Sequence, residues 1–213
     1  MTDPAGLRRR YARGHLDDDA VADSWFPQLR SWFDEAVADP DVLEANAVQW
    51  ATVTPDGRPA VRTVLVKGLD ERGIVVYTNY ESAKGRDVAA HPYAAAVLLW
   101  PTQERQVRLS GTVERATRAE TEAYFASRPR ESQLGAWASP QSQVVESRHA
   151  LDARVAQVEQ RFGDGPIPAP PFWGGLRLVP DAVEFWQGRP GRVHDRIRFR
   201  LDGDAWVRER LAP

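Results

Sequence analysis

From Ala45 onward, the apolar residues of this chain recur at every second position, and short turn segments separate one run from the next. Residues two apart project from the same face of a β-strand, so this spacing is typical of strands with one buried face. Turn-forming residues at Pro55-Asp56-Gly57 and at Asp70-Glu71-Arg72-Gly73 would join successive strands as hairpins. The pattern therefore predicts a chain built mainly on antiparallel sheet.

The predicted strands are interrupted by helices. Strands are expected at residues 47–53, 59–67, 74–78, 94–100, 106–114, 175–179 extending into 183–187, 196–201 and 205–210. Helices are expected at 24–37 with Ser24 as N-cap, at 82–91, at 117–127 with Thr117 and Glu120 as a capping pair, at 132–138 and at 145–162. The proline-rich stretch 166–171 predicts an extended connector. Antiparallel strands with interspersed helices predict an α+β fold on a closed or nearly closed sheet.

Composition narrows the domain organisation and the kinds of partner. The 213 residues contain no Gly/Ser linker, so we expect one domain at 24–213 after a polar, mobile segment at 1–23. A net charge of −2 argues against a nucleic-acid surface. Without cysteine and with four scattered histidines, no metal site is expected. The chain has neither a signal-peptide core nor an apolar run of spanning length, which predicts a cytoplasmic location without a membrane partner.

The segment from Glu184 to Arg196 carries the strongest chemical signal. An apolar, aromatic run breaks at a Gly/Pro turn and is followed by Arg192, His194 and Arg196 at alternating positions. If this stretch is a strand, two guanidiniums flank a titratable imidazole on one face, which suits an anionic ligand and proton exchange. The alternative interpretation is a solvated edge strand whose charges discourage aggregation.

Three further segments have side chains that suit phosphate groups. Arg62 to Lys67 places a cation at each end of an apolar strand, which is also compatible with simple snorkelling. Tyr77 to Lys84 runs from a strand end into a helix start, where free amides and the helix dipole favour an anion. Arg128, Arg130 and Ser132 flank another helix start, although capping residues alone would explain them. Four such segments in a slightly acidic chain predict two anionic groups in one site.

Taken in order, these segments resemble the pyridoxine (pyridoxamine) 5′-phosphate oxidase family. The resemblance extends from Trp25 to Pro213, and its most specific parts are Arg128-Pro129-Arg130-Glu131-Ser132-Gln133-Leu134-Gly135-Ala136-Trp137 and Glu184-Phe185-Trp186-Gln187-Gly188 with Arg192, His194 and Arg196. It implies an antiparallel split β-barrel of the FMN-binding type with surrounding helices. It also implies FMN as cofactor and a homodimer with FMN at the subunit interface.

The resemblance assigns roles by position. It implies that FMN is held by Arg62, Thr63, Val64, Leu65, Lys67, Tyr77, Thr78, Lys84, Gln106, Gln141, Ser142, Trp186 and Arg196. It implies that the substrate is held by Lys67, Tyr124, Arg128, Ser132, Arg192, His194, Arg8 and Tyr11, with Arg192 and His194 as the catalytic pair against its ring. At Ala83 the family often has an arginine, so one contact to the FMN phosphate is expected to be missing. The acidic stretch Asp17-Asp18-Asp19 stands where relatives can be basic, and no regulatory site is carried over to it.

The implied activity belongs to vitamin B6 metabolism. FMN would take a hydride from the 4′ carbon of pyridoxine or pyridoxamine 5′-phosphate, giving pyridoxal 5′-phosphate, and oxygen would be reduced to hydrogen peroxide. One alternative is a split-barrel FMN- or deazaflavin-dependent reductase acting on another substrate, which would not need Arg128, Ser132, Arg192 and His194 together. Another alternative is a non-catalytic carrier of flavin or pyridoxal phosphate. Steady-state peroxide production would distinguish the oxidase from such a carrier.

Overall fold

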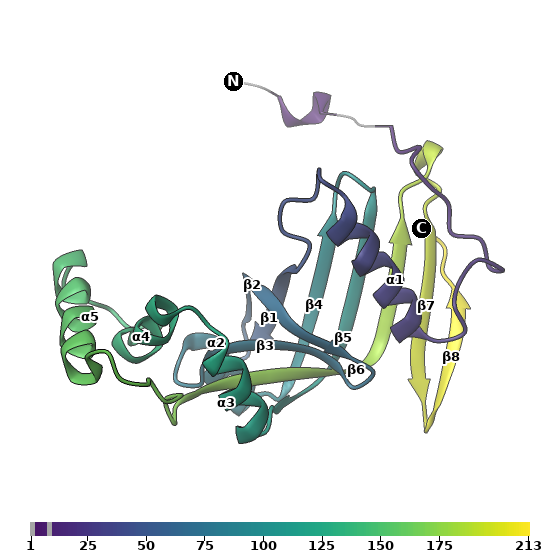
Figure 1. The fold of residues 1–213 in the computed structure, drawn as a ribbon. Coiled ribbons are helices and arrows are strands. Elements are labelled where there is room, and N and C mark those ends of the chain that lie inside the picture. The colour runs from purple at the N-terminus through teal and green to yellow at the C-terminus, as the bar shows by residue number, and fades with distance from the viewer. Residues whose placement is uncertain (1–2, 8–9) are drawn as a thin grey trace. The chain divides into compact units, whose positions relative to one another are not determined.

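The computed structural model describes residues 3–7 and 10–213, so the predicted substrate residue Arg8 lies outside the described part. Five α-helices are present there: α1 Trp25–Ala38, α2 Ala83–Ala90, α3 Arg118–Ala126, α4 Arg130–Ala138 and α5 Arg148–Phe162 (Figure 1). The strands are β1 Ala47–Val53, β2 Pro59–Asp70, β3 Gly73–Asn79, β4 Tyr93–Trp100, β5 Arg105–Arg115, β6 Trp173–Gln187, β7 Asp195–Asp202 and β8 Ala205–Arg210. Short 3-10 turns occur at Pro4–Gly6 and Pro190–Arg192. None of these helices is both long and apolar enough to cross a membrane.

The eight strands form one sheet in the order β3-β2-β1-β4-β5-β6-β7-β8, with an additional pairing of β3 with β6. This extra pairing is antiparallel and runs from Ile74 opposite Leu178 to Asn79 opposite Trp173. It closes the first six strands of the list on themselves, which leaves β7 and β8 as an extension. The fold is therefore the predicted α+β split β-barrel with surrounding helices.

By its internal contacts the chain divides into two compact units, which are described separately. Unit 1 comprises Met1–Trp50, Ala95–Gly111 and Pro180–Pro213. Its core is aromatic: the ring of Trp32 on α1 meets Phe185 of β6 edge-on at 5.3 Å, and Phe185 meets Phe199 of β7 at 5.9 Å. Strands β7 and β8 form a hairpin in which Asp202 pairs with Ala205. Period-2 alternation along β7 buries Ile197 and Phe199 and leaves the alternate residues Arg196, Arg198 and Arg200 partly exposed.

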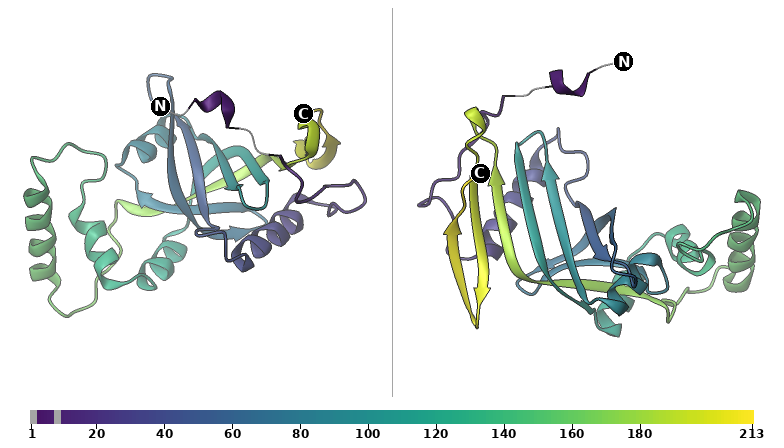
Figure 2. Two further views of the ribbon diagram at one scale, coloured as in Figure 1. Left: turned by 90° about the horizontal axis from the view of Figure 1, so that it is seen from above. Right: turned by 180° about the vertical axis from the view of Figure 1, so that it is seen from behind.

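Unit 2 comprises Ala51–Ala94 and Thr112–Val179. Its helices α4 and α5 lie side by side in both views of Figure 2, and Trp137 of α4 meets Phe162 of α5 at 5.5 Å. A second buried group fixes α3 and α4 to the start of β6; its members are Phe125, Leu134, Ile167, Ala169 and Trp173. Helix α3 begins with the predicted capping box, in which Thr117 and Glu120 satisfy each other's backbone N–H groups.

One prediction about the C-terminal strands is wrong. Arg192, His194 and Arg196 do not alternate on one strand, because β7 begins only at Asp195. The preceding residues form a 3-10 turn, and Gly191 and Arg192 adopt the left-handed backbone conformation with φ of 70° and 64°. A left-handed turn reverses the chain locally and so abolishes period-2 alternation. Among the smaller differences, α5 begins at Arg148 rather than at residue 145, since Ser147 provides its N-cap, and α4 begins at Arg130 rather than at residue 132.

Candidate functional site

The structure gathers the predicted site residues into two groups, one in each unit. In unit 2 they surround a cavity of about 430 Å³. The cavity is lined by Val64, Leu65, Lys67, Tyr77, Thr78, Asn79, Tyr124, Arg128, Ser132, Gly135, Ala136, Ser139, Gln141 and Trp173. Two of these described lining residues are cations, Lys67 and Arg128, and none is a carboxylate. The cavity is therefore suited to a ligand that carries its own negative charge.

Arg128 is held in this cavity by aromatic packing. It follows the last turn of α3, and its guanidinium carbon lies 4.7 Å from the ring centroid of Trp173 and 5.5 Å from that of Phe125. Its Nη1 atom is buried and has no hydrogen-bond partner among the described residues. Burial lowers the pKa of Arg128 from its usual value, an effect that Tyr124 opposes. The side chain stays a cation at neutral pH and forms no ion pair with the described residues, so it presents a buried donor to a ligand.

Ser132 and Lys67 approach the same cavity from other elements. Ser132 lies in the first turn of α4, and Lys67 lies on the exposed side of β2 next to the bulge between Val66 and Gly68. The neighbouring Arg130 does not contribute, because its guanidinium donates to the backbone carbonyls of Gly163 and Gly165. The cavity therefore combines a planar cation, a flexible cation and a hydroxyl, which together suit a phosphate.

Stacked aromatic rings form one wall of the cavity. Tyr77 of β3 lies parallel to Tyr124 of α3 at 4.0 Å and to Trp173 of β6 at 5.4 Å. The register of β3 on β6 brings these side chains together, since Tyr77 pairs with Gly175 and leaves room for the rings. Burial raises the pKa of both tyrosines, so the phenols remain neutral.

A second cationic group lies at the start of α2. Lys84 is buried, and its Nζ atom donates to Thr78 Oγ1 at 3.1 Å and to Gln141 Oε1 at 3.5 Å. Burial lowers the pKa of Lys84, Arg62 adds to the effect, and Asp87 opposes it. Ser82 caps the helix by accepting from the N–H of Gly85. An ammonium and a helix N-terminus at one place match the donors that a flavin phosphate needs.

The other predicted cofactor residues of unit 2 lie on β2 and after α4. Arg62 donates to Thr52 Oγ1 at 2.6 Å and forms an ion pair with Asp87 at 3.4 Å. On β2, Val64 and Leu65 line the cavity and Thr63 is exposed. After α4, Gln141 accepts from Thr78 at 2.7 Å, whereas Ser142 is exposed with φ of 68°. The donors of Lys84, Arg62 and the start of α2 therefore fit the phosphate of FMN. The hydrogen bonds of Thr78 to Lys84 and Gln141 were not predicted from the sequence.

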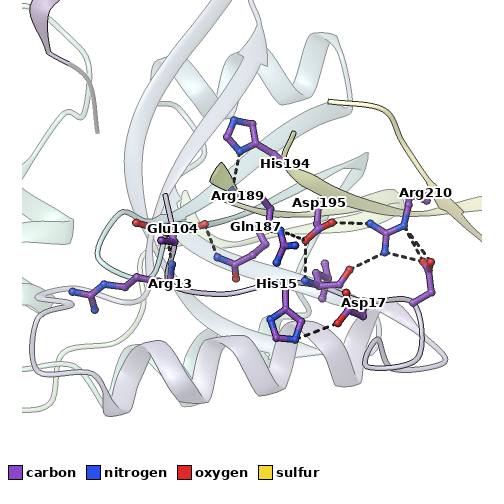
Figure 3. A network of polar contacts seen from close by, with 12 residues as sticks. Arg13, His15, Asp17, Glu104, Gln187, Arg189, His194, Asp195 and Arg210 are labelled. Atoms are coloured by element: carbon purple, nitrogen blue, oxygen red, sulfur yellow. Dashed lines mark hydrogen bonds and ion pairs between the residues drawn. The ribbon is translucent and has the colours of Figure 1, made fainter. Parts of the chain in front are cut away.

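In unit 1, the predicted residues collect around His194. The ring of His194 lies 4.7 Å from that of Trp186 and 5.6 Å from that of Tyr11. Its Nδ1 atom accepts a hydrogen bond from the backbone N–H of Arg189 at 3.1 Å (Figure 3). A cavity of about 320 Å³ adjoins it, lined by Leu7, Arg10, Tyr11, Arg189, Pro190, Gly191, Arg192 and His194. Arg192 and His194 thus share a cavity despite the lost strand alternation.

Two predicted cofactor residues of unit 1 lie elsewhere. Arg196 is occupied by Glu184, to which its Nε atom donates at 2.7 Å, and by the carbonyl of Ala212 at 2.8 Å. The hydrogen bond to Glu184 raises the pKa of Arg196. Gln106 lines another cavity, of about 450 Å³, together with Trp186 and Glu104. No sequence motif marks Glu104, whose carboxylate accepts from backbone N–H groups about ninety positions earlier in the chain.

Comparison with known proteins decides the family. Residues 33–162 match the family described as pyridoxamine 5′-phosphate oxidase. Residues 173–213 match its companion, the pyridoxine 5′-phosphate oxidase C-terminal dimerisation region. The chain belongs to the pyridoxamine 5′-phosphate oxidase family. Family membership supports an oxidoreductase, and the dimerisation region supports a homodimer.

Curated relatives of the pyridoxamine 5′-phosphate oxidase family match this chain over nearly its whole length. A pyridoxine/pyridoxamine 5′-phosphate oxidase of Frankia alni is 57% identical over 99% of this chain and 89% of the relative. The protein of the same name from Ectopseudomonas mendocina is 52% identical over 98% of both chains. The motif residues identified in the sequence therefore lie within a region of continuous similarity.

Solved structures of the family agree with the fold. PhzG from Burkholderia lata 383, crystallised with tetrahydrophenazine-1-carboxylic acid, gives a TM-score of 0.82 at 30% identity, covering 90% of this chain and 98% of that one. A pyridoxamine 5′-phosphate oxidase-related, FMN-binding protein from Nostoc punctiforme gives a TM-score of 0.69 at 22% identity, covering 86% and 96%. The second similarity concerns the fold alone.

Proposed function

We propose that this protein is an FMN-dependent oxidase that converts pyridoxine 5′-phosphate and pyridoxamine 5′-phosphate to pyridoxal 5′-phosphate. Oxygen is the electron acceptor and is reduced to hydrogen peroxide; the amine substrate also takes up water and releases ammonia. The observation that carries the proposal is the cavity of unit 2, which has Lys67 and Arg128 but no carboxylate in its described lining. Support comes also from the relatives named pyridoxine/pyridoxamine 5′-phosphate oxidase, which are 52–57% identical to this chain.

In this proposal, the cations of the cavity bind the substrate phosphate. Arg128 offers a planar set of donors, Ser132 offers a hydroxyl, and Lys67 adds charge. The phosphate is remote from the carbon that reacts, so its binding energy aligns the pyridine ring without taking part in the chemistry. The neutral phenol of Tyr124 adds a donor beside the guanidinium.

The proposed cofactor is FMN, held by Lys84, Arg62 and the start of α2 at its phosphate end. When bound, FMN supplies the hydride acceptor and the route of the electrons to oxygen. The chain contributes binding and orientation: Thr78 and Gln141 fix the ammonium of Lys84 through the hydrogen bonds described above. Trp186 and Arg196 of unit 1 are proposed to contact the same cofactor.

Arg192 and His194 are proposed to act at the substrate ring. The backbone N–H of Arg189 occupies Nδ1 of His194, so in the neutral imidazole the proton resides on Nε2. That nitrogen is then a hydrogen-bond donor, suited to orienting a ring substituent. Arg192 is exposed and supplies positive charge at the same cavity.

We also propose that FMN lies at the interface of a homodimer, with residues from both subunits. The strands carry exposed apolar side chains that a partner would cover, among them Val61 of β2 and Leu99 of β4, which are 68% and 48% exposed. Co-expression of an Arg62→Ala chain with a Trp186→Ala chain, each inactive alone, tests the arrangement. Recovery of part of the activity supports a shared site, and no recovery in a dimer that forms normally contradicts it.

An aerobic assay tests the function itself. The purified protein is reconstituted with FMN and given pyridoxamine 5′-phosphate, while pyridoxal 5′-phosphate and peroxide are measured together. Equal amounts of both products support the oxidase. A protein that binds FMN without forming either product contradicts it. The structural similarity to PhzG makes tetrahydrophenazine-1-carboxylic acid the comparison substrate, and its preferential oxidation would assign the cavity to a carboxylate ligand instead.

A further inference from the structure

Glu104 has an unusual backbone and an unusual environment for a glutamate. It precedes β5, has φ of 56°, and is only 3% exposed. The left-handed conformation is unfavourable for a residue with a Cβ atom and persists where the surrounding structure imposes it. A buried carboxylate likewise requires hydrogen-bond donors. Both features indicate that contacts made by Glu104 hold it in place.

Those contacts join the N-terminal segment to the end of β6. The Oε2 atom of Glu104 accepts from the backbone N–H groups of Ala12 at 2.7 Å and Arg13 at 2.8 Å (Figure 3). Its carbonyl accepts from the N–H of Gly188 at 2.8 Å and from Nε2 of Gln187 at 3.1 Å. A charged acceptor with two backbone donors is a strong anchor for residues that are not in a helix or strand.

The residue just before this anchor is Tyr11. Its ring meets Trp186 edge-on at 5.7 Å and His194 at 5.6 Å. Gly188 makes the approach possible, because a Cβ atom there would lie 2.9 Å from Cγ of Tyr11 and 3.1 Å from Cβ of Glu104. Glu104 thus holds the segment from one side while Gly188 leaves room for the ring.

A separate set of bonds anchors the segment further along. The N–H of Leu16 donates to Asp195 Oδ2 at 3.0 Å, and Arg210 donates to the carbonyl of Leu16 at 2.8 Å. Arg210 also forms ion pairs with Asp18 and Asp195, each at 3.0 Å (Figure 3). This anchor is five residues from Tyr11, so the anchor nearer to the Tyr11 ring is that of Glu104 at Ala12 and Arg13.

We propose that Glu104 is a positioning residue, which anchors Ala12 and Arg13 so that Tyr11 lies against His194 and Trp186. Tyr11 then forms a wall of the cavity of about 320 Å³ that adjoins His194. The proposal rests on the proposed oxidase, in which this cavity receives the substrate ring. Glu104 acts through Tyr11 and does not itself contact the substrate. Loss of the Glu104 side chain is expected to weaken substrate binding more than it lowers the rate at which bound substrate reacts.

The test compares three variants by hydrogen exchange and by steady-state kinetics. In Glu104→Ala, the amides of Ala12 and Arg13 should exchange at least about tenfold faster, because they lose their acceptor. The KM for pyridoxamine 5′-phosphate should rise about tenfold, with a smaller change in kcat. Glu104→Gln keeps an acceptor oxygen without the charge and should be intermediate. Gly188→Ala should release Tyr11 by steric conflict and raise KM in the same way, although Glu104 is intact.

Leu109→Ala is the control for general destabilisation, since Leu109 is a buried side chain of β5, the strand that Glu104 precedes. It should lower the thermal midpoint without accelerating exchange at residues 12 and 13. Unchanged exchange in Glu104→Ala would overturn the anchor. Accelerated exchange with an unchanged KM would overturn the positioning role. If the parent protein oxidises no substrate, the catalytic part falls with the proposed function, while the exchange result still decides the anchor.

Discussion

Arg128 and Trp173 form a cation–π pair, with the guanidinium carbon 4.7 Å from the ring centroid. One residue follows α3 and the other begins β6, forty-five positions later in the chain. The indole contacts the guanidinium, and the buried Nη1 atom has no hydrogen-bond partner in the described chain. A planar cation that is held by a cation–π contact is preorganised for the oxygens of a phosphate.

Removing this cation should affect phosphorylated substrates selectively. Arg128→Ala is expected to lower kcat/KM for pyridoxamine 5′-phosphate 10- to 100-fold, since a charge-assisted hydrogen bond contributes about 1.5–3 kcal/mol. The value for unphosphorylated pyridoxamine should change much less. Arg128→Lys keeps the charge but loses the planar guanidinium and should be intermediate.

Arg130→Ala provides the control for this experiment. Arg130 lies two residues away, is exposed, and binds the backbone carbonyls of Gly163 and Gly165 instead of lining the cavity. Its removal should change kcat/KM by less than about threefold, consistent with an exposed side chain that contributes little. Equal losses in Arg128→Ala and Arg130→Ala would show that general positive charge matters, not the guanidinium inside the cavity.

Ala83 offers a gain-of-affinity prediction. It is the first residue of α2, between the capping Ser82 and the buried Lys84. Ala83→Arg should lower the Kd for FMN about tenfold, because an added charge-assisted contact to a phosphate contributes about 1.5 kcal/mol or more. Without FMN, the same cation should slightly lower the thermal midpoint, since positive charge is unfavourable at a helix N-terminus.

Quenching of FMN fluorescence measures this affinity directly. Ala83→Gln is the control, because it adds a side chain of similar length without charge. The gain in affinity should also shrink at high salt, where exposed charges are screened. An unchanged Kd in Ala83→Arg would place the flavin phosphate away from the start of α2.

Glu120 predicts a pH-dependent contribution to stability. Its pKa is lowered to about 2, first by the hydrogen bond from the backbone N–H of Thr117 and then by that from Arg72. The same carboxylate pairs with the buried Arg177 at 3.1 Å. Because the pKa is lower in the folded state, the stabilisation is complete above about pH 4.5 and is lost as the pH falls towards 2.

Urea unfolding of Glu120→Gln measures this contribution. The variant should be about 1 kcal/mol less stable than the parent at pH 6, in line with the loss of a charged capping residue. The difference should diminish below pH 4. Glu122→Gln removes the same charge from the same helix, but its exposed carboxylate pairs with Arg118, so a change below about 0.5 kcal/mol is expected. A difference that is constant from pH 6 to 3 would contradict the assignment.

The parts of the fold that were predicted correctly depend on local chemistry. The Thr117–Glu120 capping box and the turn at Asp70 to Gly73 use side chains a few residues apart, so their signals are present in the sequence. Period-2 alternation also predicted β8 at its observed bounds. Tight turns and caps therefore allowed most elements to be located without tertiary information.

The parts that were not predicted depend on contacts between distant residues. Alternation suggested that Arg192, His194 and Arg196 share one strand face, yet the backbone at Arg192 is left-handed, at a position where nothing in the residue type requires it. Glu104 shows no motif, since its partners are backbone N–H groups. Backbone donors are the same at every non-proline position, so their use as ligands leaves no sequence signal.

The tautomer of His194 gives the last prediction. Its Nδ1 atom accepts from the N–H of Arg189, so the neutral ring should carry its proton on Nε2. Nitrogen chemical shifts of histidine-labelled protein distinguish the two tautomers directly.

His194→Gln can present an amide N–H near the position of Nε2, whereas His194→Asn can only replace the acceptor at Nδ1. We therefore expect kcat/KM to decrease from the parent to His194→Gln to His194→Asn, by about tenfold at each step for one lost hydrogen bond. His149→Gln, at an exposed position of α5, should leave it unchanged. A proton on Nδ1, or equal activity of the Asn and Gln variants, would contradict a donor role for Nε2.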